Sequence, residues 1–478
     1  MAKVVPGYPF SEYVSAGPAL SQEAKELADA FILVVKRRSL PKEFCVKYGL
    51  TEKQAEVEAF VRSVDATSIH KPLAPSAMDD LLVELKKIFE GNPEAEGIAR
   101  YVSVEVHGYR LLQPLFDDFE LEEIMVNGVR KPVMVVHRAH GICRSDLAFS
   151  TDKEYREFIM QVCGSTVSYY YDGRLVDGSR VNVMLPPSVV EPVVTVRKFR
   201  KEQLSLIDLI ANRTVTPELA AFLWVCVDGF NVYPLNILII GGPASGKTST
   251  LKAIAAFIPP SERVITVEDT REINLGSCEN WVALEASEKI SLDDLLKNTL
   301  RMRPDRILVG EVRGAEAITL FTAMNVGQRG MIGTMHAYTG REAVRRLENA
   351  PMTVPRALIP LLNVLIVQQK IPTSSGAFVR RIMEVSEVSK MEDQIALNEI
   401  FKWNDETGEI ARTEMPITML ERLSKATGQP ITALSEELDN RARILEYLRE
   451  RNVTSQQDVN TFLSKYYAEA FGRKVKGS

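Results

Sequence analysis

The sequence predicts an α/β protein in which a parallel-sheet domain follows an α+β domain and an N-terminal helical bundle. The main observation is that apolar runs alternate with helical segments in the second half of the chain: "LNILII", "RVITVED", "RILVGEV" and "GMIGTMHA". Such alternation is typical of parallel strands covered by helices on both faces. The length of 478 residues suggests roughly three domains.

Composition and charge narrow the possible functions. The formal net charge is -5, with acidic and basic residues interspersed, so no specific nucleic-acid partner is expected. The longest apolar run, "LAAFLWVCV", is about half the ~20 residues of a membrane helix, and "MAKVVPGYPF" has no signal-peptide core. No cysteine pair has C-x-x-C spacing, which favours a soluble protein of the reducing cytoplasm without a zinc ribbon or disulfide framework. The cysteines are Cys45, Cys143, Cys163, Cys226 and Cys278.

Residues 1–95 are expected to form the helical bundle. Apolar residues recur at helical spacing in "SQEAKELADAFILVVKRRSL". A second helix is predicted from Thr51, because "TEKQ" matches a capping box in which Gln54 reaches back. A third begins near Ser76 and stops at Gly91. The simplest role for these helices is regulation or packing without chemistry.

Residues 96–202 are expected to form the α+β domain. The segments "RYVSVEVHGY", "EEIMVNGV" and "PVMVVHRAHGICRS" are rich in Val and Ile and predict strands and hairpins. A helix is predicted in "STDKEYREFIMQVCG", and two strands flank the Pro-Pro turn of "VNVMLPPSVVEPVVTVRKF". The charged stretch "RKEQLS" leads into a predicted linker over residues 203–215.

Residues 216–478 are expected to form the parallel-sheet domain with C-terminal helices. Its first helix is "TPELAAFLWVCVDG". A late hairpin is predicted for "VLIVQQKI" and "RRIMEVSEV", which the tight "SSGAF" loop joins. From about residue 415 the pattern is helical again, through "ELDNRARILEYLRERN" and "SQQDVNTFLSKYYAEAF".

The segment "GGPASGKT" is a complete phosphate-loop pattern between a predicted strand and a predicted helix. Its backbone N–H groups and the helix N-terminus favour phosphate, so ATP or GTP with Mg²⁺ is the expected ligand. Lys247 would reach the β- and γ-phosphates, and Thr248 would offer its hydroxyl to Mg²⁺. The predicted nucleotide-binding residues are Gly241, Gly242, Pro243, Ala244, Ser245, Gly246, Lys247, Thr248 and Ser249.

Polar residues follow the next three predicted strands. Glu268 and Asp269 end "RVITV", Glu311 and then Arg313 follow "RILVG", and His336 follows "GMIGT". Each one alone is more simply a helix cap or a packing residue. Ligands of open α/β sheets, however, lie at the carboxyl ends of the strands, and the series beside a phosphate loop favours a joint functional role.

Hydrolysis requires a held Mg²⁺, an oriented water and neutralisation of developing charge. Glu311 fits the metal shell, directly or through water, and Glu268 fits the group that polarises the attacking water. His336 could sense the γ-phosphate. These roles, with ATP and Mg²⁺ as ligands, complete a candidate catalytic site.

The α+β domain supplies candidates for an additional positive charge near the γ-phosphate. Arg174 and Arg180 lie in "YDGRLVDGSR", and Arg197 lies in "TVRKF". They would act if that domain folds over the nucleotide. The alternative is a solvated basic edge.

The four boxes "GGPASGKT", "TVEDTREI", "RILVGEVRGAEA" and "GTMHA" together resemble the secretion-type ATPases of type II and type IV secretion, type IV pili and the archaellum. The segments "LVDGSRVNVMLPP" and "VTVRKF" also look like that family's N-terminal domain, so the resemblance covers roughly residues 98–400. "LRMRPDRILVGEVRGAEAITLFTAMNVGQRGMIGTMHA", followed by "PMTVPRALIPLLNVLIVQQ", looks most like the archaellum motor ATPases. One departure is Arg271, where many relatives have Pro, and the four-cysteine zinc insertion of many pilus-assembly members is missing.

The resemblance implies a RecA-like P-loop ATPase domain and a homo-hexameric ring. ATP would bind between the two domains, with Arg180 and Arg197 closing on the γ-phosphate. The motion of the ring would drive assembly or rotation of a filament at a polytopic membrane platform protein. Accessory cytoplasmic motor proteins, and a place at the inner face of the cell membrane, are implied as well.

Other phosphate-loop proteins are the competing interpretations. A transporter ATPase should carry an "LSGGQ"-like signature, which the sequence lacks, and a helicase should show a basic face. A small-molecule kinase does not explain a large N-terminal domain with paired arginines. A non-hydrolysing nucleotide-binding regulator would not need both Glu268 and Glu311. The load, whether archaellum, adhesive pilus or secretion pseudopilus, stays open.

Overall fold

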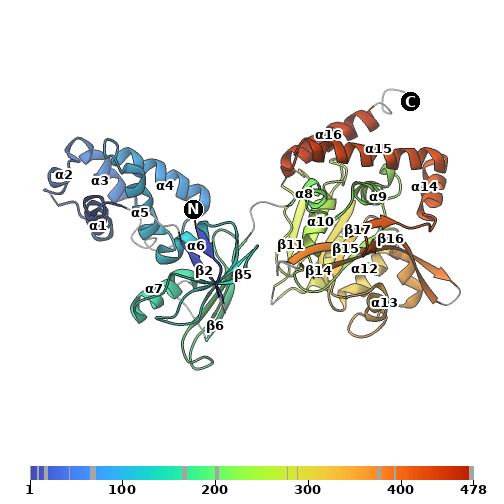
Figure 1. Ribbon diagram of the computed structural model, residues 1–478, viewed down its shortest axis with the longest axis horizontal. Helices are drawn as coiled ribbons and strands as arrows, with labels where there is room; N and C mark the ends of the chain where they lie inside the picture. The colour runs from blue at the N-terminus through green and yellow to red at the C-terminus, as the bar shows by residue number, and fades with distance from the viewer. Residues whose placement is uncertain are drawn as a thin grey trace. The chain divides into compact units, whose positions relative to one another are not determined.

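The computed structural model of the chain contains two compact units, Met1–Lys201 (unit 1) and Glu202–Ser478 (unit 2) (Figure 1). The residues that the structure describes are 2–7, 10–15, 20–41, 43–64, 72–163, 169–199, 204–276, 278–287, 289–373, 378–391 and 394–472.

The helices of unit 1 pack around a cluster of phenylalanines. The rings of Phe31 and Phe89 lie edge to face with centroids 5.0 Å apart, and Phe60 packs on Phe31 at 5.8 Å. All three side chains are buried. The helices are α1 (Gln22–Arg37), α2 (Phe44–Lys47), η1 (Thr51–Lys53), α3 (Gln54–Ser63), α4 (Pro75–Ile88) and α5 (Ala95–His107).

Two predictions for this helical part are wrong. The capping box at Thr51 is absent, because Thr51 lies in a 3₁₀ turn and the N-cap of α3 makes no side-chain hydrogen bond. The segment "RYVSVEVHGY" is the second half of α5 rather than a strand. The buried residues Ile98, Val102 and Val106 of α5 recur every four positions, so packing of one helical face outweighs the β-propensity of valine.

The described residues of unit 1 also form an eight-stranded sheet in the order β1-β2-β5-β4-β3-β8-β7-β6. Helix α7 (Asp152–Cys163) and the short α6 (Gln113–Asp117), which follows η2 (Arg110–Leu112), contribute side chains to its core. The strands are β1 (Lys3–Val5), β2 (Ser11–Val14), β3 (Leu121–Val126), β4 (Met134–His137), β5 (Gly141–Ser145), β6 (Tyr170–Arg174), β7 (Arg180–Met184) and β8 (Val193–Arg197).

The first fourteen residues therefore do not belong to a purely helical segment, as the prediction for residues 1–95 had it. β2 pairs in parallel with β5, with Tyr13 opposite Ser145, and the Tyr13 side chain is buried in the core of the sheet. The helices α1 to α5 are thus an insertion between two strands of one sheet. Strands of three and four residues are too short to show the alternation that identifies strands in a sequence.

Unit 2 contains the predicted parallel sheet. The described strands follow the order β11-β10-β12-β13-β9-β14-β15-β16-β17, parallel from β11 to β14 and antiparallel from β14 to β17. The predicted late hairpin is present as β14 and β15, while residues 374–377 of its "SSGAF" loop lie outside the described residues. The strands are β9 (Ile237–Ile240), β10 (Val264–Glu268), β11 (Trp281–Glu285), β12 (Arg306–Val312), β13 (Ile332–Met335), β14 (Val364–Pro372), β15 (Phe378–Met391), β16 (Gln394–Asn404) and β17 (Glu409–Arg412).

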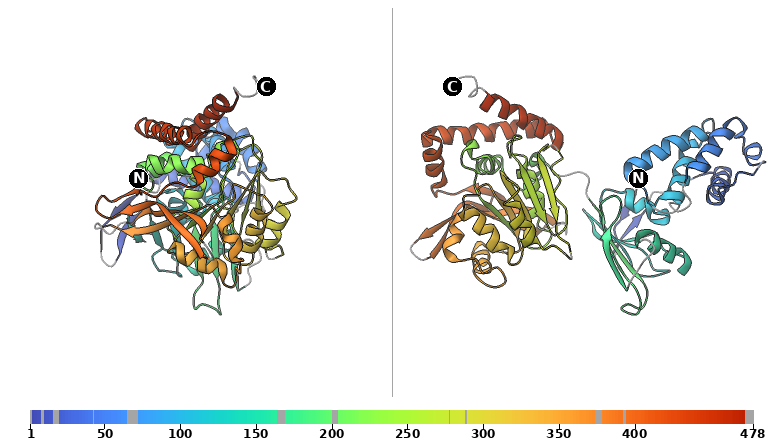
Figure 2. Two further views of the ribbon diagram at one scale, coloured as in Figure 1. Left: turned by 90° about the vertical axis from the view of Figure 1, so that its right-hand side faces the viewer. Right: turned by 180° about the vertical axis from the view of Figure 1, so that it is seen from behind.

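Helices cover both faces of this sheet, and the two views of Figure 2 show the C-terminal helices across one side of it. One hydrophobic core joins the sheet to α8, α9, α10, α14, α15 and α16, and a second joins it to α11, α12 and α13. No described helix is both long enough and apolar enough to cross a bilayer. The helices are α8 (Leu206–Ala211), α9 (Pro217–Asp228), η3 (Gly229–Asn231), α10 (Lys247–Ala255), α11 (Leu292–Thr299), α12 (Glu316–Asn325), α13 (Gly340–Glu348), η4 (Arg356–Leu361), α14 (Met419–Thr427), α15 (Ile431–Glu450) and α16 (Gln456–Gly472).

The predicted linker over residues 203–215 contains a helix instead of an open connection. Ser205 and Asp208 form a reciprocal capping box at the start of α8. Four apolar side chains that follow are buried in the core of unit 2, so burial holds this segment on the domain. They are Leu206, Ile207, Leu209 and Ile210.

A buried ion pair attaches the C-terminal helices to α9. The guanidinium of Arg441 lies 2.8 Å from the carboxylate of Asp228, and the two side chains are 1% and 0% exposed. The Arg441 guanidinium also lies over the rings of Trp224 and Phe230, at 4.8 and 5.0 Å from their centroids. This contact makes α15 an integral part of unit 2.

Candidate functional site

The phosphate-loop pattern forms a tight loop between β9 and α10. Gly246 is the N-cap of α10 with φ +95°, and Ala244 has φ +55°. A Cβ on Gly241 would lie 2.1 Å from the carbonyl oxygen of Gln368, so this position excludes every side chain. The loop is therefore a cradle of backbone groups at the N-terminus of a helix, the arrangement that binds phosphate.

Lys247 points its ammonium group into this cradle. Its Nζ donates to the carbonyl oxygens of Gly241 at 3.0 Å and Gly242 at 2.9 Å, and lies 3.4 Å from Nδ1 of His336. The residue is 7% exposed. Burial lowers the pKa of the Lys247 ammonium, while the charge of Glu311 acts in the opposite direction.

His336 connects Lys247 to Glu311. The Nε2 atom of His336, directly after β13, lies 2.8 Å from Oε1 of Glu311 near the end of β12. An ammonium group can only donate, so Nδ1 of His336 accepts from Lys247, whereas Oε1 of Glu311 makes no hydrogen bond among the described residues despite its short distance to Nε2. The predicted sensor, the predicted metal-shell residue and the phosphate-loop lysine therefore form one chain of contacts.

Arg313, which the sequence placed in the series of strand-terminal residues without a specific task, extends this chain. Its guanidinium donates to Oε2 of Glu311 and lies 3.9 Å from Oδ2 of Asp269. The contact with Glu311 raises the pKa of the Arg313 guanidinium. The signal in the sequence was the two-residue spacing, because alternate residues of a strand share a face.

Glu268 ends β10 and is 2% exposed. Its Oε1 accepts from the backbone N–H groups of Glu272 at 2.9 Å and Ile273 at 3.0 Å. Oε2 has no hydrogen-bond partner within the described part of the chain. Burial raises the pKa of this carboxyl to about 7, which the two backbone hydrogen bonds oppose. A carboxyl with such a pKa can take up a proton near neutral pH, as a general base must.

The side chain of Glu268 also lies against β12. A Cβ on Gly310 would lie 2.9 Å from Cγ of Glu268. Glycine at this position, directly before Glu311, therefore leaves room for the Glu268 side chain. The two predicted catalytic carboxylates therefore lie at the same edge of the sheet, on neighbouring strands.

The residues present fit a magnesium ion that arrives with a nucleotide. Thr248 and Ser249 are half-buried in the first turn of α10, and Ser245 Oγ is buried without a hydrogen-bond partner among the described residues. No described group of three or more His, Cys, Asp or Glu could hold a metal by itself. Mg²⁺ typically takes one or two protein oxygens together with phosphate oxygens. Thr248 and Glu311 can supply these protein oxygens.

The three predicted arginines lie together on the sheet of unit 1. Arg174 is paired with Arg180, Arg180 with Arg197, and Arg197 with Glu123. Residues directly opposite each other share a face, so they form one row across β6, β7, β8 and β3. Arg180 also lies 3.6 Å from Asp172. Arg180 and Arg197 are exposed, and the contact of these arginines with a nucleotide stays a prediction.

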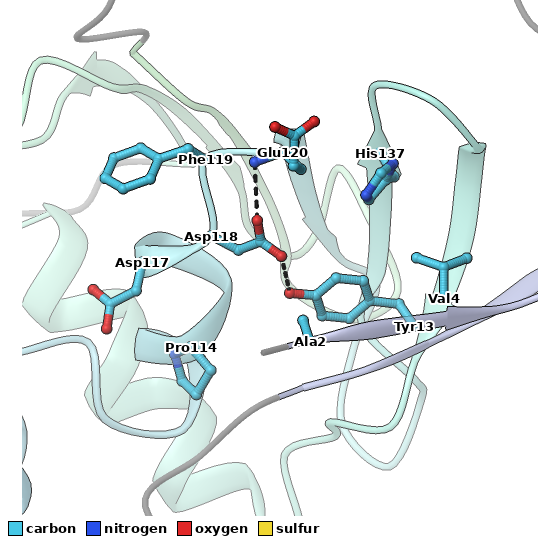
Figure 3. Close-up of a pocket in the computed structure, with 9 residues that line it drawn as sticks. All are labelled: Ala2, Val4, Tyr13, Pro114, Asp117, Asp118, Phe119, Glu120 and His137. Atoms are coloured by element: carbon cyan, nitrogen blue, oxygen red, sulfur yellow. Dashed lines mark hydrogen bonds between the residues drawn. The ribbon is translucent and has the colours of Figure 1, made fainter.

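Unit 1 carries a separate pocket of about 440 Å³, lined by residues of β1, β2, β4 and the segment before β3 (Figure 3). Tyr13 donates to Oδ2 of Asp118 at 2.5 Å, and the backbone N–H of Glu120 donates to Oδ1 at 2.9 Å. The pocket contains none of the predicted site residues. The hydrogen bond between Tyr13 and Asp118 links β2 to the segment before β3.

Several known proteins are similar to this chain over much of its length. An uncharacterized protein of Methanocaldococcus jannaschii is 32% identical over 376 residues, which are 74% of this chain and 67% of that protein. The probable conjugal transfer protein TrbB of Sinorhizobium fredii is 31% identical over 303 residues, 61% of this chain and 91% of that protein. The X-ray structure of the ATPase DotB from Legionella pneumophila is 15% identical with a TM-score of 0.44, and the match covers 82% of this chain and 96% of DotB.

The family profile described as "Type II/IV secretion system protein" matches residues 140–449, more than half of the chain. The matched range contains the phosphate loop, both predicted catalytic carboxylates, His336 and the three predicted arginines. The chain belongs to the family of type II/IV secretion system proteins.

Proposed function

We propose that this protein is a Mg²⁺-dependent ATPase that works as a homo-hexamer and drives assembly or rotation of an archaellum or type IV pilus-like filament. The observation that carries the ATPase proposal is the continuous chain of contacts from Lys247 through His336 to Glu311, beside the phosphate loop. The proposed location is the cytoplasmic face of the cell membrane. The proposed partners there are a polytopic platform protein and accessory cytoplasmic motor proteins.

Each residue of the site has a chemical task in this proposal. The backbone N–H groups of the loop and the Lys247 ammonium bind the phosphates. Glu268 accepts the proton of the attacking water, because its raised pKa matches neutral pH. Mg²⁺ neutralises charge on the phosphate oxygens when it is bound with the nucleotide. Arg180 and Arg197 are proposed to add positive charge at the γ-phosphate, as arginine fingers do.

Lys247→Ala tests the proposal directly. Loss of the charge-assisted contacts should weaken ATP binding on the order of 2–3 kcal/mol and abolish hydrolysis. Phosphate release from ATP by the purified chain measures the rate. Lys297→Ala is a suitable control, because Lys297 pairs with Asp293 on an exposed helix face. Equal ATPase rates for wild type and Lys247→Ala would refute the site.

Glu311→Gln tests the metal-shell role separately. The substitution removes the charge and keeps the shape, so the Mg²⁺ concentration for half-maximal activity should rise. Glu268→Gln should leave that concentration unchanged and reduce the rate instead. The reverse pattern would exchange the two roles.

A second candidate function is that of a traffic ATPase of a type II or type IV secretion system, or of an adhesive-pilus assembly ATPase. The relative named as a conjugal transfer protein favours it, since the match covers 91% of that protein. Deletion of the gene in the native cell distinguishes the candidates. Loss of swimming filaments supports the first function, whereas loss of conjugation, secretion or adhesion with intact swimming supports the second.

The hexamer has its own test. Light scattering with and without a non-hydrolysable ATP analogue should show a particle of six chains that forms or tightens with nucleotide. If the chain stays monomeric with and without the analogue, the hexamer proposal is wrong, while the proposed phosphate-loop enzyme stands.

A further inference from the structure

Strands β14 and β15 carry residues that contact the phosphate loop, and none of these residues has a task in the proposed chemistry. β14 runs parallel to β9, with Val367 opposite Ile240. Gln368 is therefore level with Gly241, the first residue of the loop. The pairing of β14 with β15 shifts register between Val367 and Gln368, so the strand is irregular at this level.

Gln368 contacts both ends of the loop. Its carbonyl oxygen lies 2.1 Å from the position of a Cβ on Gly241, and its Nε2 lies 2.9 Å from that position on Gly246. The residue is 1% exposed, and its Oε1 accepts a hydrogen bond of 2.8 Å from Oγ1 of Thr250. Thr250 is fully buried in α10. One residue thus connects the strand, the two glycines and the helix that follows the loop.

Arg380 of β15 holds the middle of the loop. Its Nε donates to the carbonyl oxygen of Ala244 at 3.1 Å, and its Cδ lies 3.1 Å from the Cβ position of Gly246. Ala244 has φ +55°, a conformation that costs free energy in residues other than glycine. A hydrogen bond from outside the loop stabilises that conformation.

We propose that Gln368, together with Thr250 and Arg380, is a positioning element that fixes the curvature of the phosphate loop for nucleotide binding. The inference rests on the proposed nucleotide-binding function of the loop. A loop already held in its binding shape loses little conformational entropy when phosphates arrive, so its affinity is higher. These residues act through the backbone N–H groups of the loop, so their loss affects Kd and KM more than kcat.

Thr250→Val and Gln368→Met in the full chain remove opposite partners of the same hydrogen bond. Each should raise the Kd for a fluorescent non-hydrolysable ATP analogue, and the KM for ATP, roughly 5-fold, as expected for one hydrogen bond. kcat should change less than about 2-fold. The double variant should bind the analogue no more weakly than the weaker-binding single variant, because both substitutions remove the same hydrogen bond. Thr250→Ser keeps the hydroxyl and should bind like wild type.

Thr299→Val is the matched control for loss of a buried hydroxyl. Thr299 is fully buried in α11, and its Oγ1 donates to the carbonyl oxygen of Leu296 at 2.6 Å. This variant should lower the melting temperature about as much as Thr250→Val and leave the Kd unchanged. Equal effects on Kd at both threonines would show that general destabilisation, rather than the loop contact, is responsible and would overturn the inference.

The outcomes separate this inference from the proposed function. If Thr250→Val and Gln368→Met bind the analogue like wild type while Lys247→Ala does not, the positioning role is wrong and the nucleotide site stands. If wild type and Lys247→Ala bind equally, the proposed function itself fails. Thr250→Val and Thr250→Ser carry the test alone if Gln368→Met does not fold.

Discussion

Glu268→Gln should change both the activity and the pH dependence of stability. The carboxyl is buried, and its pKa is raised from 4.5 to about 7 in the folded state. A raised carboxyl pKa means that the folded state prefers the protonated form. The stability that this proton gives is complete below about pH 4.5 and is lost as the pH rises through 7.

The size of the effect follows from the two pKa values. The full difference of pKa corresponds to about 3 kcal/mol, and about 2 kcal/mol of it falls between pH 5.5 and pH 8.5. Glutamine does not titrate, so the variant should lack this part of the pH dependence. For a domain of this size, 2 kcal/mol shifts the melting temperature by roughly 4 °C.

Thermal unfolding of wild type and Glu268→Gln across this pH range measures the difference directly. The melting temperature of wild type should fall relative to the variant as the pH rises. The ATPase rate of wild type should decrease below about pH 7, so the variant should be slower by roughly 10²–10⁴ above that pH and the difference should narrow below it. Glu421→Gln, on the exposed face of α14, is the control for loss of a carboxylate. Parallel melting curves for wild type and Glu268→Gln would refute the raised pKa.

Three further predictions concern other parts of the chain. Arg197→Ala should leave the Kd of the full chain for ATP nearly unchanged and cut its ATPase rate 10-fold or more, whereas a solvated arginine would leave the rate unchanged. Arg441→Met leaves the buried carboxylate of Asp228 unpaired and should lower the free energy of unfolding of unit 2 by about 3–5 kcal/mol in denaturant titrations; a loss below 1 kcal/mol would contradict the role of the pair. Tyr13→Phe removes the hydrogen bond to Asp118 and should destabilise unit 1 by about 1–3 kcal/mol, with the unfolding of unit 2 as an internal control.

The sequence identified the phosphate-loop domain well because its signals are local. β9 is a fully buried apolar run directly before the loop pattern, and that pattern places Lys247 at the start of α10, as the structure shows. The order of strand-terminal residues also anticipated the contact between His336 and Glu311, since parallel strands end at the same edge.

The errors arose where tertiary contacts outweigh local preference. α5 is rich in valine and folds as a helix because one of its faces is buried. β1 and β2 owe their existence to a partner strand about 130 residues away, which no local pattern reveals. Gln368 was unmarked for the same reason, since its importance comes from the backbone of another strand at Gly241.

The insertion of α1 to α5 between β2 and β3 has a consequence for synthesis on the ribosome. β2 pairs locally with β1 but cannot pair with β5 until β5 has emerged, and closing a loop of this length costs about 4 kcal/mol of chain entropy. The helical insertion, whose contacts are local, can therefore fold before the β1–β2 hairpin docks on β5. Until the hairpin docks, the hydrogen-bonding edge of β5 is open, and it is a point where nascent chains can associate wrongly.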